Sequence, residues 1–167
     1  MNQIFKTSRL VVDEINSLLI EKISDEFFLS ILKILTPSVV KDLPPYFNNV
    51  LTLSDAKAWV DKMACESQFL TVTFAEKPEL IGFIFIYKGE NLEAHIGYLL
   101  KEDYWGKGLA KELLSEFICW CKTQTSWSKL VGGVSKDNFV SSNLLTKLGF
   151  MKSGSDDNHS VFYEYQL

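Results

Sequence analysis

The sequence predicts a single mixed α/β domain in which a central, mostly antiparallel sheet is flanked by helices. The first observation is a hairpin, because residues 69–75 and 80–87 are apolar runs rich in β-branched and aromatic side chains, with a short polar turn between them. Residues 92–100 add a third strand. The second observation is a change of period, since residues 108–123 carry apolar side chains at helical spacing and residues 129–134 return to a strand pattern.

The N-terminal part of the chain is predicted to hold one strand and several helices. Residues 9–13 form the strand, and residues 18–35 carry apolar side chains at helical spacing, as one or two helices, until Pro37 ends the pattern. Thr52 and Asp55 have the spacing of a capping box, which predicts the start of a further helix.

The C-terminal part is predicted to hold a helix and a hairpin. Residues 142–148 form the helix, and Gly149 ends it as a left-handed cap. Residues 150–153 and 160–166 then pair across a polar tip. Because no repeat, linker or low-complexity tract interrupts the chain, we expect one domain over residues 1–167.

Composition and charge argue against several classes of partner. Hydrophobic residues make up 47% and charged residues 23% of the 167 residues, as is ordinary for a globular protein. The net charge of −4 and the pI near 5.2 argue against a nucleic-acid partner, which requires a basic surface. Since no apolar run reaches membrane-spanning length and the N-terminus lacks a signal-peptide core, we expect a cytoplasmic protein with no membrane partner.

The sequence does not predict a metal site. The three cysteines, Cys65, Cys119 and Cys121, have no Cys-x-x-Cys spacing, and only His95 and His159 supply imidazole groups. Zinc sites require clusters of such ligands at short, regular spacings. We therefore expect the protein to act without a metal ion.

Residues 96–111 carry the strongest functional signal. An apolar strand pattern breaks at Lys101, passes through Trp105-Gly106-Lys107-Gly108 and continues as the predicted helix. Glycine lets the backbone approach a ligand closely, and the start of a helix offers free N–H groups and the positive end of the helix dipole. A strand, a glycine-rich turn and a helix in this order therefore predict a site for a phosphate group. The alternative is a tight turn with no ligand.

A second motif, Asn-x-x-Ser followed by an apolar helix and Gly-Phe, occupies residues 138–150, about 30 residues after the glycine-rich turn. The two motifs together resemble the GNAT (Gcn5-related N-acetyltransferase) superfamily, whose pyrophosphate signature is Gln/Arg-x-x-Gly-x-Gly/Ala. Trp105, Gly108 and Ala110 match that signature, with Trp105 in place of Gln or Arg. Residues 96–98 and 104–110, Ile-Gly-Tyr and Tyr-Trp-Gly-Lys-Gly-Leu-Ala, resemble the ribosomal-protein N-terminal acetyltransferase-like subgroup, which tolerates this change, and the Arg-Leu pair that begins at Arg9 fits the subgroup too.

The resemblance implies a GNAT-like fold of about six to seven strands, splayed at the cofactor site, with acetyl-CoA as cosubstrate. The glycine-rich turn and helix start would bind the pyrophosphate through backbone N–H groups, and Asn138 would hydrogen-bond the cofactor arm. A bulged segment of the central strand would supply the donor to the thioester carbonyl. The implied cofactor-binding residues are Tyr98, Leu99, Leu100, Trp105, Gly106, Lys107, Gly108, Leu109, Ala110, Lys111, Asn138 and Ser141.

The acid that protonates the departing thiolate is not the residue found in many family members. Those proteins place a tyrosine seven residues after the Asn, where this chain has Leu145. The subgroup resemblance implies Ser141 in this role. A serine before a helix has an alternative role as its N-cap, and the two roles are compatible.

The base that accepts the amine proton has several candidates. Glu93 and His95 alternate on one strand and therefore share a face. An imidazole has a pKa suited to proton abstraction near neutrality, although a histidine on a sheet is often structural. The subgroup resemblance points instead to the segment between the last two strands, where Asp157 and His159 are poorer matches. A water chain with no single base is a further alternative.

We therefore expect an N-acetyltransferase that moves the acetyl group of acetyl-CoA to the primary amine of a protein N-terminus or a small molecule. By resemblance, the N-terminal helices form one wall of the acceptor groove, where Tyr46, Phe47 and Trp59 either line the groove or belong to the core. The main alternative is a catalytically weak or inactive CoA-binding regulatory module of the same fold; a weaker one is an α/β domain without a nucleotide ligand. The sequence is compatible with a monomer or a homodimer.

Overall fold

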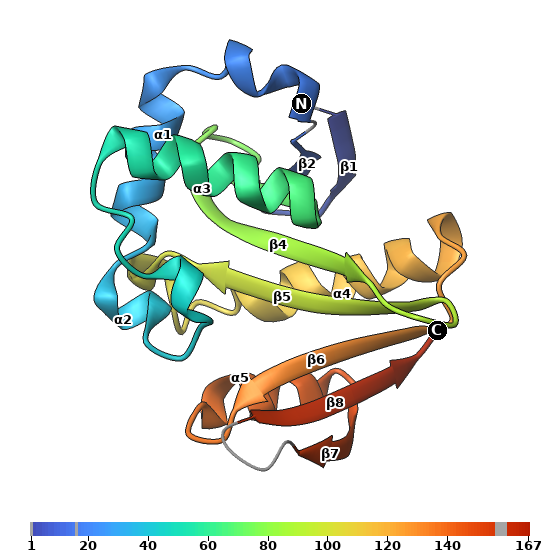
Figure 1. The fold of residues 1–167 in the computed structure, drawn as a ribbon. Coiled ribbons are helices and arrows are strands. Elements are labelled where there is room, and N and C mark those ends of the chain that lie inside the picture. The colour runs from blue at the N-terminus through green and yellow to red at the C-terminus, as the bar shows by residue number, and fades with distance from the viewer. Residues whose placement is uncertain (1, 16, 156–159) are drawn as a thin grey trace.

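The computed structural model describes residues 2–15, 17–155 and 160–167, and an eight-stranded sheet forms its centre (Figure 1). The strand order is β1-β2-β3-β4-β5-β6-β8-β7, and neighbouring strands are antiparallel except β5 and β6, which are parallel. The strands are β1 (Asn2–Lys6), β2 (Leu10–Glu14), β3 (Gln68–Phe74), β4 (Leu80–Lys88), β5 (Glu93–Leu100), β6 (Lys129–Ser135), β7 (Met151–Ser155) and β8 (Ser160–Gln166).

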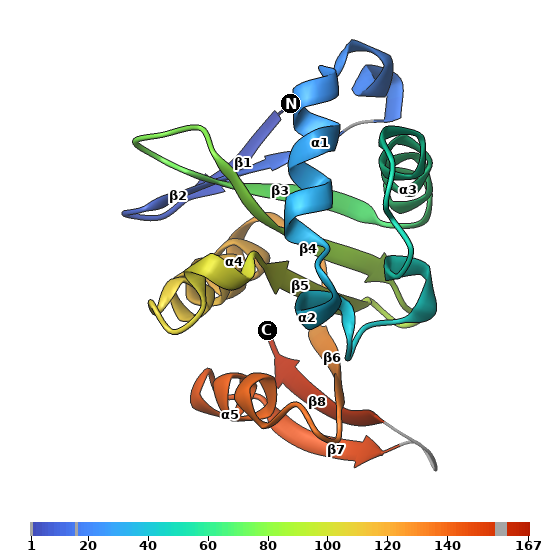
Figure 2. The ribbon, with the colours of Figure 1, turned by 90° about the vertical axis from the view of Figure 1, so that its left-hand side faces the viewer.

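Helices cover both faces of the sheet, with α1 and α3 on one face and α4 and α5 on the other (Figure 2). The helices and helical turns are η1 (Ser17–Lys22), α1 (Asp25–Ile34), α2 (Pro37–Val40), η2 (Pro45–Phe47), α3 (Leu53–Glu66), η3 (Glu102–Tyr104), α4 (Leu109–Gln124) and α5 (Phe139–Lys147). Within the described ranges, every helix is too short or too polar to span a membrane.

Two hydrophobic cores fill the space between the sheet and its helices. Trp59 and Phe69 belong to the core beneath α1 and α3, and Leu113 and Phe117 belong to the core beneath α4. Alternate side chains of a strand point to opposite faces, so β5 contributes to both cores. This central strand is therefore fixed from both sides.

The predicted hairpins and the capping box are confirmed. Thr52 Oγ1 accepts the Asp55 N–H at 3.1 Å, and Asp55 Oδ2 accepts the Thr52 N–H at 2.8 Å. The sheet has eight strands rather than six or seven, because β1 was not predicted. It is an edge strand in which only Phe5 is buried, so no alternation of apolar side chains marks it. The helix expected at 142–148 begins earlier, at Phe139.

Gly82 allows β4 to approach the end of β5 closely. A Cβ atom at this position would lie 2.3 Å from the Leu99 carbonyl oxygen, a backbone atom that cannot rotate away. Gly154 on β7 has open space around it, because a Cβ atom there would meet no described atom within 4 Å. The two glycines therefore form a matched pair for testing the packing of β4 on β5.

We predict that Gly82→Ala lowers the free energy of unfolding by about 1–3 kcal/mol, as overpacking a filled site does. Urea denaturation measures this change. Gly154→Ala is the control, and its unfolding midpoint should stay the same or rise slightly. A Gly82→Ala variant with the wild-type midpoint would contradict the close approach of these two strands.

Candidate functional site

β5 and β6 separate partway along their length. Their parallel pairing ends at Ile96 and Gly132, although β5 continues to Leu100 and β6 to Ser135. Figure 1 shows the two strands diverging toward their C-terminal ends. Beyond this point, no strand among the described residues pairs with the edge of β5 that faces β6.

β5 keeps its pairing with β4 while β6 departs. The register continues without a shift to Gly82 and Leu100, so the bulge that the resemblance implied is absent from this pair of strands. Lys101 donates its N–H to the Ile81 carbonyl at 2.7 Å, which makes Gly82 and Leu100 a non-hydrogen-bonded pair. Strand alternation then places the N–H groups of Tyr98 and Leu100 on the edge that faces away from β4. These two donors border the gap left by β6.

Two adjoining cavities open where the strands diverge. The larger, of about 780 Å³, lies between the loop after α2, the strand β5 and the loop after β6. The smaller, of about 80 Å³, lies between β5, β6 and α5. Asp42, Leu43 and residues 96–98 contribute to both, so the two cavities share part of their walls, and together they are called the opening below.

The N-terminus of α4 follows β5 after one short loop. Within that loop, Gly106 and Gly108 have φ angles of +72° and +76°, a region that side chains with a Cβ atom rarely adopt. Gly108 is the N-cap, and because glycine has no side chain it cannot cap the N–H groups of Leu109, Ala110 and Lys111. A helix start of this kind attracts anions.

Trp105 and Lys107 both contact residues that precede this turn. Trp105 Nε1 donates to the Leu100 carbonyl at 2.8 Å, which ties the loop to the end of β5. The Lys107 ammonium lies 5.1 Å from the centre of the Tyr104 ring, within the range of a cation–π contact. The first contact holds the loop against β5, and the second places the Lys107 ammonium over the Tyr104 ring.

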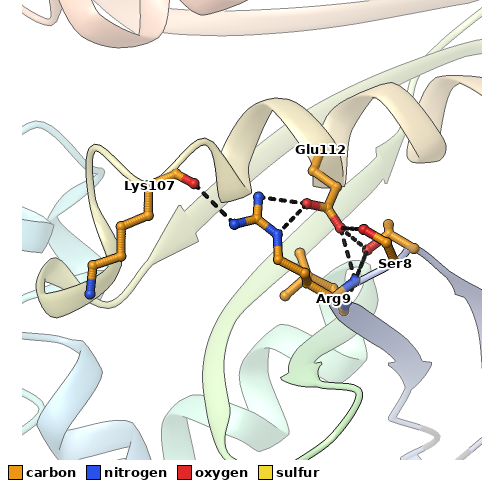
Figure 3. Close-up of polar contacts among 6 residues, drawn as sticks. Ser8, Arg9, Lys107 and Glu112 are labelled. Carbon is orange, nitrogen blue, oxygen red and sulfur yellow. Dashed lines mark hydrogen bonds and ion pairs between the residues drawn. The ribbon is translucent and has the colours of Figure 1, made fainter.

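Arg9 joins the turn between β1 and β2 to the start of α4 (Figure 3). Its Nε and Nη2 both lie 2.6 Å from Glu112 Oε2, and its Nη1 donates to the Lys107 carbonyl at 3.2 Å. Glu112 Oε1 also accepts hydrogen bonds from the hydroxyls of Thr7 at 2.5 Å and Ser8 at 2.9 Å. Burial opposes ionisation of Glu112, but these hydrogen bonds outweigh it and lower the pKa of Glu112 to about 2.

Asn138 and Ser141 meet β5 at the smaller cavity. Asn138 is the N-cap of α5, and its Oδ1 accepts the Ser141 N–H at 3.0 Å. The N-cap role considered for Ser141 therefore belongs to Asn138. Tyr98 Oη donates a hydrogen bond to Ser141 Oγ at 3.2 Å. Three of the residues predicted to bind the cofactor thus meet at the smaller cavity, Tyr98 from β5 and the other two from the start of α5.

His95 and Glu93 share a face of β5, as predicted, but their surroundings differ. His95 Nε2 lies 4.0 Å from Glu93 Oε2, and the half-exposed imidazole lines the larger cavity. Glu93 is held by Lys129 at 2.8 Å, which also pairs with Glu164 at 3.2 Å. Glu93 lines neither cavity. The structure therefore brings His95, but not Glu93, to the wall of the opening.

The aromatic candidates divide between the cavity and the core. Tyr46 and Phe47 line the larger cavity, and Phe47 is also part of the core, where it is as buried as Trp59 and packs against it with 5.7 Å between ring centroids. Asp157 and His159 lie outside the described residues. In the part of the chain that the structure describes, no cluster of three or more His, Cys, Asp or Glu residues has the arrangement of a metal site.

A comparison with protein families identifies the family of this chain. The family model described as an acetyltransferase (GNAT) domain matches residues 18–151, which is most of the chain. The chain belongs to the GNAT acetyltransferase family.

Relatives and solved structures agree with this assignment. The uncharacterized N-acetyltransferase p20 of Bacillus licheniformis is 31% identical over 113 residues, which cover 65% of this GNAT chain and 63% of p20. The alignment thus spans less than two thirds of that relative's length. A GNAT acetyltransferase from Bacillus anthracis superimposes with a TM-score of 0.79 at 17% identity over 96% of each chain. RimL, a ribosomal L7/L12 α-N-protein acetyltransferase in complex with coenzyme A, gives 0.81 at 16% identity over 99% of this chain and 98% of its own.

These likenesses confirm the GNAT fold that the two sequence motifs implied, with a mixed, mostly antiparallel sheet. Sequence reasoning assigned no role to the side chains of Arg9, Asp42 and Tyr98. Arg9 lies 103 positions from Glu112, so no local pattern links the two residues. The side chain of Tyr98 was open to prediction, because alternation along β5 places it on the same face as Ile96 and Leu100.

We predict that Glu112 stabilises the fold only while it is ionised. Its folded pKa, about 2, lies below the ordinary value of 4.5, so its stabilising contribution is present above pH 4.5 and is lost as the pH falls toward 2. Glu112→Gln should therefore unfold at lower urea concentration than wild type at pH 6, and the difference should shrink between pH 4.5 and 2. Glu102→Gln, at an exposed position on the loop before α4, should unfold like wild type throughout. If the urea midpoints of wild type and Glu112→Gln differ by the same amount at every pH, this role is contradicted.

Proposed function

We propose that this GNAT protein is an acetyltransferase that moves the acetyl group of acetyl-CoA to a primary amine. One observation carries the proposal: the unpaired edge of β5 is followed, after one short loop, by the uncapped N-terminus of α4. An amide-containing chain can bind to a free strand edge, and a diphosphate can bind to a helix start. CoA carries both groups in one molecule, and the coenzyme A in the RimL structure supports this choice of ligand.

The described residues divide the binding of CoA among three places. The N–H groups of Tyr98 and Leu100 would pair with the pantetheine arm and donate to the thioester carbonyl, where negative charge develops during transfer. Residues 106–111 would bind the pyrophosphate, with Lys107 adding positive charge. Asn138 and Ser141 would face the arm from the opposite side of the gap. Leu99 would support this arrangement, since alternation directs its N–H toward β4.

The larger cavity would receive the acceptor amine. Tyr46 and Phe47 give it an apolar wall, and Asp42, whose carboxylate lies 3.9 Å from the Lys41 ammonium, lines both this cavity and the smaller one. A primary amine is cationic near neutral pH, and a carboxylate at this point would attract it. His95 on the same wall would take the proton that the nitrogen loses as it attacks the thioester.

The proposal is tested by incubating the protein with acetyl-CoA and a panel of peptides and small primary amines. Free thiol release and the mass of the acceptor are followed together. Amine-dependent thiol release with an acceptor heavier by one acetyl group is the expected result. Binding of CoA by calorimetry without transfer to any acceptor would favour the CoA-binding regulatory module, and absence of both would refute the site.

We predict that Gly108→Asp weakens the binding of CoA roughly tenfold or more, because it places a negative charge beside the helix start that would hold the pyrophosphate. Gly108→Asn is the matched control, since Asn has nearly the same size and tolerates a positive φ equally well. Calorimetry should show a much smaller loss for Gly108→Asn. Equal affinities for the two variants would place the pyrophosphate elsewhere.

A further inference from the structure

A tyrosine hydroxyl reaches the smaller cavity from a strand rather than from α5. Leu145 stands at the α5 position where the resemblance implies a tyrosine, and only 1% of its surface is exposed. Tyr98 on β5 instead directs its hydroxyl at Ser141, with 3.2 Å between the two oxygens. Both residues line the cavity where β5 and β6 diverge.

The Ser141 hydroxyl has a proton left to donate. A hydroxyl carries one proton and two acceptor sites, and Tyr98 occupies one of the acceptor sites. Asn138 caps the Ser141 N–H, so the serine oxygen is not used as the cap. Ser30 and Thr146 donate to the carbonyl four residues earlier in their helices, each at 2.9 Å. Among the described residues, Ser141 Oγ has no such carbonyl acceptor.

We propose that Tyr98 is a positioning residue for the leaving group, which donates to Ser141 Oγ and so directs the Ser141 O–H at the sulfur of CoA. This inference rests on the proposed function, because that function places the thioester in the gap between β5 and β6. Hydrogen bonds in a chain polarise one another, so donation by Tyr98 also strengthens donation by Ser141.

The chemistry requires stabilisation of a negative sulfur. As the amine attacks, the C–N bond forms, the C–S bond breaks and the electron pair of that bond stays on sulfur. The Ser141 O–H stabilises the developing thiolate by hydrogen bonding. No net transfer from Tyr98 is needed, because a thiol with a pKa of about 8.5 is more acidic than a phenol with a pKa of about 10. Burial raises the pKa of Tyr98 further, so it remains a protonated donor, and solvent protonates the thiolate after release.

Steady-state kinetics at saturating acetyl-CoA provide the first test. Tyr98→Phe removes only the hydroxyl, and it should lower kcat roughly tenfold, the upper end of the effect of one hydrogen bond. The KM for acetyl-CoA should change little, because the interaction strengthens only as charge develops. The double variant Tyr98→Phe/Ser141→Ala should match Ser141→Ala alone, since Tyr98 acts through Ser141. Tyr165→Phe, which removes a hydroxyl bonded to Lys122, is the control and should keep the wild-type kcat.

Two kinetic outcomes would overturn the inference: a wild-type kcat for Tyr98→Phe, or losses in the two single variants that multiply in the double variant. An equilibrium measurement, which does not need turnover, completes the test. The pKa of the thiol of bound CoA, followed by thiolate absorbance, should be lower than that of free CoA; it should rise in both Tyr98→Phe and Ser141→Ala, and no further in Tyr98→Phe than in Ser141→Ala. A lowered thiol pKa without acetyl transfer to any acceptor would refute the proposed function and retain the assignment of Tyr98. A thiol pKa that neither variant changes would refute the assignment itself.

Discussion

The loss of pairing between β5 and β6 beyond Ile96 and Gly132 is the constraint on which the site depends. A strand inside a sheet must satisfy its N–H and C=O groups, and in the part of the chain that the structure describes no strand pairs with this edge of β5 over its last residues. α4 follows β5 and α5 follows β6, so both helices begin near the end of the gap where the strands are furthest apart (Figure 1). The free strand edge and the start of α5 therefore line one opening, and the start of α4 lies beyond the end of β5.

Parts of the chain that are distant in sequence keep β5 in place while β6 departs. β4 remains paired to the end of β5, and Gly82 lets the two backbones approach closely. The Arg9–Glu112 pair ties the N-terminal hairpin to the first turn of α4, and a hydrogen bond from Arg9 to Lys107 fixes the glycine turn. A site whose donors are held in this way loses little entropy when a ligand binds, which favours both affinity and catalysis.

Local signals in the sequence predicted most of the elements, and pairings over long distances escaped prediction. The hairpin of β3 and β4, the capping box at Thr52 and the positive φ of Gly149 follow from neighbouring residues. The Arg9–Glu112 pair does not, because only the folded chain brings the two residues together. Asn138 and Ser141 are both good N-cap residues three positions apart, and the backbone decides between them. Strand alternation predicted that Glu93 and His95 share a face, but capture of Glu93 by Lys129 depends on the pairing of β5 with β6.

Amide hydrogen exchange, measured by NMR at single residues with and without saturating acetyl-CoA, tests most directly whether the free edge of β5 is the binding surface. We expect the Tyr98 and Leu100 amides, which face the gap, to exchange much more slowly with ligand. The Leu99 amide, which faces β4, should change far less and serves as the internal reference. Calorimetry on the same sample establishes that acetyl-CoA is bound. If the Tyr98 and Leu100 amides of the bound protein still exchange at the rates of the free protein, the free edge of β5 is not the binding surface.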